Sequence, residues 1–368
     1  MPEVGVLLTP RELGGHESAL LGWLADAARE DGLDALVFAP TPALREACAQ
    51  AGLPAADIAW PASANGQRLA ALRVLAGWPA QQPLLLAPGV LHAAAWLLAA
   101  AVLLRRRVWL YVPNAHSARR MGYRWAAARD HALAPWLRHA EALVTVDDGH
   151  AHTLRGAWRV GVPVYCLPNL PRLPEPGTRP PAAPAGDALL RVGYVGRFDA
   201  HAKGLDWLAA VLRRRPAWAA HCCWRFQGRG PAEAALLELA SALGPQRVEV
   251  HPHAPLDEAL AAADLLLLPS RYEGVPLVAL EATARGWPVV ASRQAGVERL
   301  LPASSLFEFG DEAGLRSALA SLRPASARAA AVAHARERQQ ALWPAERHQA
   351  VRRTVVRAWR MPPERAAS

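Results

Sequence analysis

Two glutamates, Glu273 and Glu281, stand eight residues apart in the segment Arg271–Val290. The apolar run 265–270 before them is typical of a buried strand, and the residues after Val275 predict a helix. Glu273 is therefore expected in the loop at the carboxyl end of a strand, and Glu281 about two turns into the helix. Ligands bind at such loops in open α/β sheets, and a helix N-terminus offers free amides to an anion. The segment is therefore a candidate site for an anionic ligand.

The chain has 41 basic residues, and Lys203 is its only lysine. It lies in the stretch Gly193–Leu208, which also contains Arg197. Lysine supplies a compact, strongly hydrated point charge that arginine does not reproduce. A retained lysine in an arginine-rich chain therefore suggests that this charge has a task here, although chance alone would also leave one lysine anywhere.

The first part of the chain alternates short apolar runs with helical patterns, which is the βαβ cadence of a parallel, doubly wound sheet. The expected strands are 4–9, 33–39, 84–87, 108–112, 142–146 and 162–167. The expected helices are 16–30, 42–51, 67–76, 91–104, 124–139 and 150–158. The Pro-rich stretch 168–188 suits neither a helix nor an inner strand, so it predicts a boundary.

The cadence restarts after this boundary. The expected strands are 190–195, 224–227, 248–251, 265–268 and 289–292, with 306–309 as a weaker sixth. This predicts an N-terminal α/β domain over 1–168, a linker over 169–188, a second α/β domain over 189–340 and a C-terminal segment over 341–368. Such a cadence alone equally suits a two-domain dehydrogenase or a binding protein of periplasmic type.

The segment around the two glutamates resembles the donor-site signature of the retaining glycosyltransferases of family 4, which have the GT-B fold. The shared parts are Pro-Ser before the loop, Glu-Gly-x-Pro, Leu-Glu-Ala, Gly-x-Pro-Val-Val-Ala and Gly296 beyond. Arg197 and Lys203 match the Gly-Arg…Lys-Gly element of that family. The resemblance is sharp over Gly193–Gly296 and loose over the first domain. It implies two Rossmann-like domains facing across a cleft, with the helix 341–361 crossing back onto the first domain.

The resemblance also implies roles for individual residues. Arg197 and Lys203 would hold the donor diphosphate and act in catalysis, Glu281 would bind the ribose hydroxyls, and Glu273 would act near the anomeric centre. An ionised carboxylate suits both glutamate roles because it accepts bonds from two adjacent hydroxyls. The helix start Gly274, Val275, Pro276 and Leu277 would complete the donor site.

Further candidates lie in the first domain. Gly14 and Gly15 fall between the first strand and the first helix, where they suit either a tight turn or the close approach of a ligand. By resemblance they and His16 form a loop near the acceptor and the diphosphate. His116 follows the strand 108–112, and the resemblance gives it a catalytic role near the donor sugar.

Other polar residues have simpler interpretations. Asp147 and Asp148 lack the Asp-x-Asp spacing of metal-dependent glycosyltransferases, and an N-cap for the helix at His150 is the better interpretation. His251 and His253 end a strand close to where the family seats the nucleotide base, but a surface position is expected for both. We expect no metal and no cofactor other than the nucleotide-sugar donor.

Composition narrows the remaining classes. With 52% hydrophobic and 20% charged residues the chain is globular, and the apolar segment 90–104 is short for a membrane span. The four cysteines lack metal spacing and the N-terminus lacks a basic leader, so we expect a reducing cytoplasm. Residues 311–368 hold eleven Arg against five Asp and Glu. This excess suits either contact with an anionic membrane surface on the cytoplasmic face of the inner membrane or a solvated face. No motif accompanies it that would indicate nucleic acid.

The sequence thus predicts a retaining, metal-independent glycosyltransferase, hexosyl or other, of EC class 2.4. It would move a sugar from a nucleotide-diphosphate donor to a glycan or lipid-linked glycan, as in the synthesis of cell-surface polysaccharide or lipopolysaccharide. The alternatives are a catalytically silent subunit that binds nucleotide sugars or glycans, and a nucleotide-sugar epimerase or phosphorylase of GT-B architecture.

Overall fold

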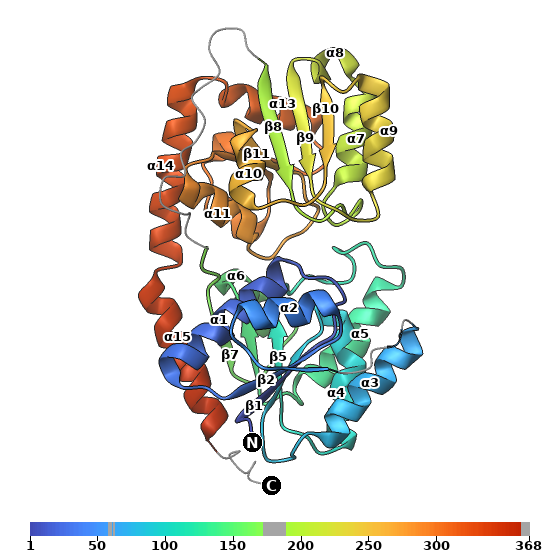
Figure 1. Ribbon diagram of the computed structural model, residues 1–368, viewed down its shortest axis with the longest axis vertical. Coiled ribbons are helices and arrows are strands. Elements are labelled where there is room, and N and C mark those ends of the chain that lie inside the picture. Colours follow the sequence, from blue (N-terminus) through green and yellow to red (C-terminus); the bar gives the residue numbers. More distant parts are fainter. Residues whose placement is uncertain (58–60, 62, 172–188, 362–368) are drawn as a thin grey trace. The chain divides into compact units, whose positions relative to one another are not determined.

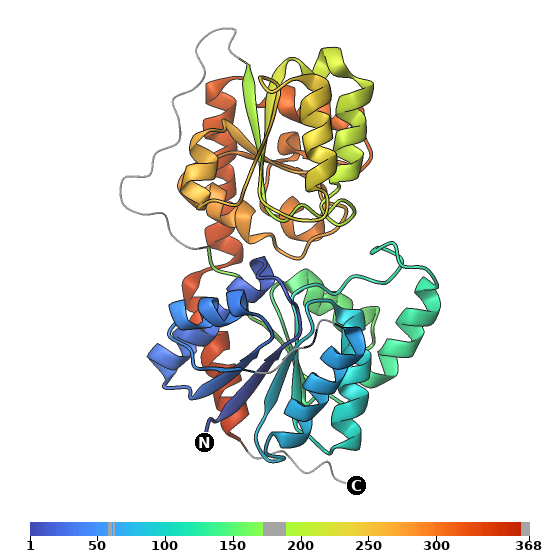
Figure 2. The same cartoon turned by 45° about the vertical axis from the view of Figure 1, so that its right-hand side comes forward.

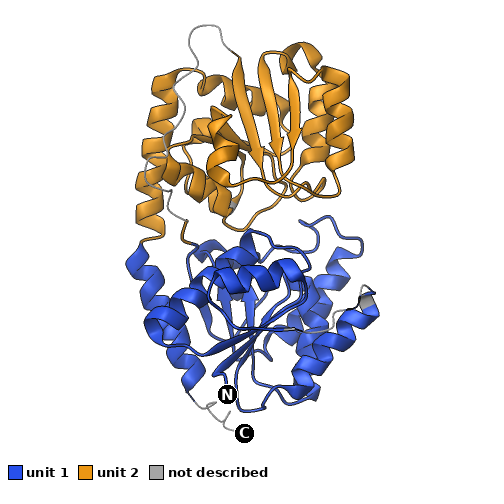
Figure 3. Cartoon of the chain, in the orientation of Figure 1, with its two compact units in different colours: residues 1–169, 345–368 blue, residues 170–344 orange. Residues whose placement is uncertain are grey.

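The computed structural model describes residues 1–57, 61, 63–171 and 189–361 of the chain. The chain folds into two compact units (Figure 3). Unit 1 comprises Met1–Asn169 together with Ala345–Ser368, and unit 2 comprises Leu170–Pro344. Most of the expected linker, residues 172–188, lies outside the described residues.

The sheet of unit 1 has seven parallel strands in the order β3-β2-β1-β4-β5-β6-β7. The strands are β1 (Val4–Leu8), β2 (Ala35–Ala39), β3 (Ala55–Asp57), β4 (Leu84–Ala87), β5 (Val108–Val112), β6 (Ala142–Thr145) and β7 (Val164–Cys166). All six expected strands are present within two residues at each end. The seventh, β3, went unrecognised because its Ala-Ala-Asp sequence lacks the β-branched and aromatic residues that mark strands.

The helices of unit 1 connect these strands and lie on both sides of the sheet (Figures 1 and 2). One group packs together from α1, α2 and the last helix, and a second from α3, α4 and α5. Right-handed crossovers require this division, because the strand order reverses between β1 and β4. The helices are α1 (Gly15–Asp31), α2 (Pro42–Gln50), α3 (Ala64–Gly77), the short 3-10 helix η1 (Leu91–Ala93), α4 (Ala94–Leu103), α5 (Ala126–Leu137), α6 (Asp148–Gly156) and α15 (Ala345–Arg360).

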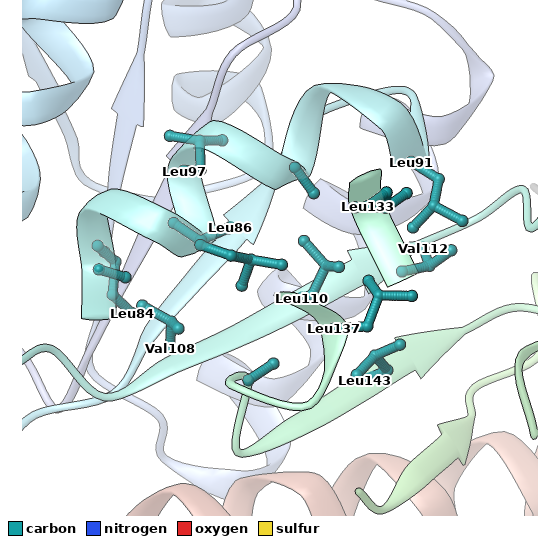
Figure 4. Packing of buried hydrophobic residues seen from close by; sticks show 14 of the residues in the cluster. Leu84, Leu86, Leu91, Leu97, Val108, Leu110, Val112, Leu133, Leu137 and Leu143 are labelled. Atoms are coloured by element: carbon teal, nitrogen blue, oxygen red, sulfur yellow. The ribbon is translucent and has the colours of Figure 1, made fainter. Parts of the chain in front are cut away.

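A continuous apolar core joins β4, β5 and β6 to α4 and α5 (Figure 4). Leu86 and Leu110 point from the sheet toward Leu97 on α4, and all three are fully buried. The apolar segment 91–104, which was expected to form a helix, therefore packs against the sheet as η1 and α4 and is part of this core. Among the described residues, no helix combines the length and the apolar character that crossing a membrane requires.

Unit 2 has a six-stranded parallel sheet in the order β10-β9-β8-β11-β12-β13. The strands are β8 (Leu190–Val195), β9 (Cys222–Gln227), β10 (Val248–His251), β11 (Leu265–Leu268), β12 (Val289–Ser292) and β13 (Leu306–Phe307). The helices are α7 (Leu205–Arg214), α8 (Pro216–Ala219), α9 (Glu233–Leu243), α10 (Leu256–Ala261), α11 (Leu277–Arg285), α12 (Ala295–Glu298), the 3-10 helix η2 (Ala303–Ser305), α13 (Glu312–Ser321) and α14 (Ala325–Leu342). All six expected strands are confirmed, and each sheet has the doubly wound, Rossmann-like order in which an inner strand comes first.

The expected single C-terminal helix over 341–361 is wrong at its start. Helix α14 ends at Leu342 and α15 begins at Ala345. Pro344 separates them, since proline has no amide hydrogen and restricts the residue before it. The boundary between the two units falls at the same break, so α15 is part of unit 1.

A buried arginine fixes α15 to α1. Arg352 is only 1% exposed, and its guanidinium donates to Asp31 Oδ2 and to Glu30 Oε2, both at 2.6 Å. Beside it, the rings of Trp359 and Trp23 lie 5.6 Å apart. A buried guanidinium is tolerated only where carboxylates compensate its lost hydration, so this ion pair and the ring contact together define the docking of the last helix.

The same helix has less spare positive charge than its sequence suggests. Arg347 pairs with Asp148 at 2.9 Å and Arg360 with Glu3 at 3.0 Å, in addition to the buried Arg352. These three arginines neutralise acids of unit 1. Ion pairs within unit 1 therefore account for three of the positive charges of the arginine-rich C-terminus. Contact with a membrane surface stays a prediction.

Replacing Arg352 with Met should lower the free energy of unfolding of unit 1 by about 3 kcal/mol, because a mostly buried Asp31 loses its counter-charge. The half-exposed Arg353, 3.5 Å from the same carboxylate, is the matched control, and its change to Met should cost less than about 1 kcal/mol. Urea unfolding followed by hydrogen exchange of α1 peptides measures both values. Equal losses in the two variants would contradict the assignment.

The difference in the free energy of unfolding between wild type and the Arg352→Met variant should also become smaller at acidic pH. The bond to Arg352 and its charge hold the pKa of Glu30 below its usual range. A carboxylate with a lowered pKa stabilises the folded state above its ordinary pKa and loses that contribution as the pH falls through the lowered value. Unfolding measured between pH 7 and pH 3 tests this, and a difference that grows in acid would contradict it.

Candidate functional site

The candidate loop lies between β11 and α11, as expected. Helix α11 begins after Pro276 and ends at Gly286, whose φ of 92° is left-handed. Glu273 lies in the loop, and Glu281 is the fifth residue of the helix. The amides at the start of α11 therefore face the carboxyl edge of the sheet of unit 2, where a helix N-terminus favours an anion.

Lys203 and Glu273, which are 70 residues apart in sequence, form an ion pair. Lys203 Nζ lies 2.6 Å from Glu273 Oε1, and the hydroxyl of Ser270 donates to the same oxygen at 2.7 Å. Glu273 is 8% exposed. Burial strengthens the attraction between the charges, so the pair connects the loop after β8 firmly to the loop after β11. The resemblance assigned both residues to one donor site but did not predict this ion pair, and their roles toward a donor stay predictions.

Asp199 connects Arg197 to the backbone of the loop after β8, which also contains Lys203. Arg197 Nη2 donates to Asp199 Oδ2 at 3.1 Å, while Asp199 Oδ1 accepts from the amide of Ala202 at 2.9 Å. The carbonyl of Asp199 also accepts from the amide of Lys203 at 3.2 Å. Asp199 thus positions both basic residues. We did not recognise it from sequence, where the only signal was an acid between the two basic motif residues.

Two glycines allow the loops to meet this closely. Gly204 has a φ of 65°, and a Cβ there would lie 2.0 Å from the carbonyl oxygen of Pro269. A Cβ on Gly296 would lie 2.3 Å from the carbonyl oxygen of Gly274. Neither position can accept a side chain without moving the backbone of the Glu273 loop. These close contacts therefore explain why glycine is needed at both motif positions.

Polar side chains from β12 and the turn after it support the loop from beneath. Gln294 Nε2 donates to the carbonyls of Ser270 at 3.0 Å and Arg271 at 2.9 Å. The hydroxyl of Ser292 also donates to the Ser270 carbonyl. Sequence reasoning missed these residues, since contacts of side chains with a distant backbone leave no periodic signal. Together with their neighbours they line a small pocket: Leu268, Ser270, Glu273, Pro276, Ala291, Ser292, Gln294 and Val297.

The candidates of unit 1 gather at the carboxyl edge of its own sheet. Gly14 is the N-cap of α1, and its amide donates to the carboxylate of Glu17 at 3.0 Å. Gly15 is the first residue of the helix, and the carbonyl of His16 accepts from the hydroxyl of Tyr111 at 3.5 Å. The glycine pair therefore forms a capped βα turn, while the proposed contact with a ligand stays a prediction.

His116 lies in the loop after β5, and its ring packs edge-on at 5.3 Å against His150. Burial, together with the smaller effect of the nearby His116, His16 and Arg120, lowers the pKa of His150 to about 3. The structure thus brings His16 and His116 together around a third histidine. His150 was expected only as the start of a helix, and nothing in its sequence context indicated this position.

The simpler interpretations of the acidic and histidine residues agree with the structure. Asp147 Oδ2 accepts from the amide of Gly149 at 2.7 Å and caps α6, which confirms the N-cap. His251 bonds to the surface Glu249 at 2.8 Å. His253 is exposed, as expected for a surface residue.

Replacing Gly296 with Ala should destabilise unit 2 by about 1–3 kcal/mol, because the added methyl group collides with the Gly274 carbonyl. The control is Gly22→Ala on the exposed face of α1, where an added Cβ meets nothing within 4 Å. That change should be neutral or stabilise by up to about 1 kcal/mol. Hydrogen exchange of residues 270–276 measures the local effect, and unchanged exchange in Gly296→Ala would contradict the packing argument.

Comparison with known proteins agrees with this geometry. Residues 190–323 match the protein family described as Glycosyl transferases group 1. Sulfoquinovosyl transferase SQD2 of Arabidopsis thaliana is 31% identical over 30% of this chain and 20% of its own length. The lipopolysaccharide core mannosyltransferase LpsB of Rhizobium meliloti is 35% identical over 31% of this chain and 34% of its own. The matched region thus spans a fifth to a third of these curated relatives.

The fold extends over nearly the whole chain. Anabaena HepE, solved in complex with UDP and glucose, superposes with a TM-score of 0.72 at 17% identity, covering 96% of this chain and 99% of its own. Sucrose-phosphate synthase of Thermosynechococcus elongatus gives a TM-score of 0.72 at 18% identity over 98% of both chains. At this identity the likeness establishes the fold. The chain has the GT-B fold, and residues 190–323 of its second unit are similar to the glycosyl transferases group 1.

Proposed function

We propose that this protein is a retaining glycosyltransferase that moves a sugar from a nucleotide-diphosphate donor to a glycan or lipid-linked glycan. The observation that carries the proposal is the Lys203–Glu273 ion pair beside the N-terminus of α11. It joins a cation, a carboxylate and helix amides at one sheet edge. These are the groups needed to hold a diphosphate and to bind sugar hydroxyls.

The basic groups would act mainly as the donor diphosphate leaves. An ammonium has three N–H donors, of which the contact with Glu273 takes one, so Lys203 keeps donors for phosphate oxygens. Arg197 and the backbone N–H groups of Gly274, Val275 and Leu277 would add to this field. Interactions that strengthen as charge develops on the leaving group accelerate the reaction, whereas equal binding of donor and transition state does not.

Glu273 would bind the transferred sugar rather than attack it. Its Oε1 accepts from Lys203 and Ser270, which fixes the carboxylate in place. An ionised carboxylate has about four acceptor positions, so it would also accept from a sugar hydroxyl near the anomeric carbon. The acceptor hydroxyl would then attack from the side of the departing phosphate and pass its proton to that phosphate. This path retains the anomeric configuration without a protein nucleophile or a bound metal.

The similar proteins indicate which substrates to test first. HepE was solved with UDP and UDP-glucose, and LpsB is described as a mannosyltransferase of the lipopolysaccharide core. We also propose that this protein acts in the cytoplasm, at the cytoplasmic face of the inner membrane where lipid-linked acceptors are presented. A thermal-shift panel of UDP-, GDP-, ADP- and dTDP-sugars with the free nucleotides would identify the base, since a ligand that binds only the folded state raises the melting temperature.

Replacing Lys203 with Gln should raise the Kd of the stabilising nucleotide sugar at least tenfold, about 1.4 kcal/mol, because the phosphate loses a cation. Gln keeps a donor for Glu273, which limits damage to the fold. The matched control is Arg214→Gln on the same loop-and-helix segment, where the guanidinium is exposed and pairs with Glu312 at 3.6 Å. Isothermal titration measures both. Equal affinities in wild type and Lys203→Gln would refute the donor-site assignment.

Replacing the two glutamates should affect different constants, the donor Kd for Glu281 and kcat for Glu273. Replacing Glu281 with Ala should weaken donor binding about tenfold, because the ribose hydroxyls lose their acceptor. Replacing Glu273 with Gln should lower kcat about 10²- to 10³-fold with less than a threefold change in donor Kd. Wild-type kinetics in both variants would remove these residues from the site. No thermal shift with any nucleotide sugar would favour a silent subunit.

A further inference from the structure

His150 is a buried histidine that the proposed reaction does not use. It lies in the first turn of α6, is 4% exposed, and its Nδ1 accepts from the amide of Ala115 at 3.4 Å. Trp158 Nε1 donates to the carbonyl of the same residue at 2.9 Å. Both backbone groups of Ala115 are thus held by side chains, which fixes the loop immediately before His116.

The hydrogen bond to Ala115 also defines the tautomer of the ring. Because Nδ1 accepts, the proton of the neutral ring lies on Nε2. The low pKa of His150 keeps the ring neutral near pH 7. Among the residues that the structure describes, none accepts a hydrogen bond from this buried Nε2. A buried donor without a partner costs about 1–3 kcal/mol, so a group outside the protein is the expected acceptor.

The surroundings of His150 are mainly basic. Besides burial, which is the largest cause, the groups that lower its pKa are His116 and Arg120 from the loop after β5 and His16 from the first turn of α1. The nearby acids are engaged elsewhere, since Asp147 accepts from the Gly149 amide and Asp148 pairs with Arg347. The segments that follow β1, β5 and β6 therefore bring side chains with N–H groups near the His150 ring. An oxyanion can accept from every one of them, whereas a hydroxyl needs an acceptor in return.

We propose that the Nε2–H of His150 binds an oxyanion, a phosphate or carboxylate, of the acceptor, with His16, His116 and Arg120 around it. The proposal rests on the proposed function and adds the chemical class of the acceptor. His150 is then both a positioning residue, through Nδ1 and the Ala115 amide, and a binding residue, through Nε2. The donor diphosphate is the other possible source of an oxyanion, and the experiment below separates the two.

Substitutions at position 150 can distinguish the roles of the two ring nitrogens. Asn at position 150 can place an oxygen near the position of Nδ1 and keep the bond to Ala115, but it removes the Nε2–H. Gln can place an N–H near the position of Nε2 and restore the donor. The control is His152→Asn, which changes an exposed histidine on the same helix.

The test uses the full chain labelled with ¹⁵N in its histidine rings, with methyl phosphate as the probe. In wild type, NMR should show the Nε2–H tautomer of His150 and a shift of that signal on titration. The apparent Kd for methyl phosphate should rise at least tenfold in His150→Asn and stay within threefold in His150→Gln and His152→Asn. The same Kd in wild type and His150→Asn, or no shift of the His150 signal, would overturn the proposal.

A second titration in saturating UDP-glucose distinguishes the sources. A His150 signal that still responds to methyl phosphate supports an acceptor oxyanion. A signal that UDP-glucose itself moves, and that methyl phosphate no longer affects, assigns the contact to the donor and overturns the acceptor assignment. Failure of the proposed function would appear instead as no nucleotide-sugar binding in the thermal-shift panel, with the phosphate response intact.

Discussion

The ion pair between Lys203 and Glu273 is the contact around which unit 2 is arranged. It is possible because β8 and β11 are hydrogen-bonded neighbours in the sheet, although 70 residues separate the two side chains. Parallel strands end at the same edge of the sheet, so the loops that follow them meet without any additional structural element. The supporting contacts of Asp199, Ser270 and Gln294 then fix each partner to its own loop. The fold supplies the proximity, and these side chains supply the orientation.

A partly buried ion pair of this kind forms only under strict geometric conditions. Its charges lose hydration, and the loss is compensated only if the geometry is good and further hydrogen bonds complete it. The close backbone approach at Gly204 and Gly296 provides that geometry, because a larger residue would separate the loops. The glycines of the motif and its charged residues are therefore parts of one requirement.

The sequence allowed most of the strands and the donor loop to be predicted. Strands β8, β10, β11 and β12 begin and end at the predicted residues, since each is a short apolar run between clear breaks. The motif residues Lys203 and Glu273 were recognised as candidates, but the ion pair between them is a finding of the structure. Strand β3 was missed because its three residues carry no strand signal, and the C-terminal helix was misplaced at Pro344. Those errors arise where a local pattern is too short or where one residue interrupts it.

The supporting residues of the site could not be predicted in this way. Asp199 and Gln294 act through bonds to backbone groups, and His150 through its burial beneath the loop that carries His116. Such contacts depend on the packing of elements distant in sequence, and periodicity reports only which face of an element is buried. The residues proposed to perform the chemistry were visible in the motifs, whereas the residues that hold them in place required the structure.

The discontinuity of unit 1 has a consequence for the order in which the protein is built. Its last helix, α15, follows the whole of unit 2 in the chain, yet it places Trp359 against Trp23 and Trp109 of unit 1. During synthesis from the N-terminus, the seven strands of unit 1 emerge first but lack this cover until residues 345–360 are made. Unit 2 is continuous and can close earlier. The first unit to be translated is therefore the last to be completed, and a nascent chain that stops before Ala345 exposes an aromatic surface that the finished protein buries.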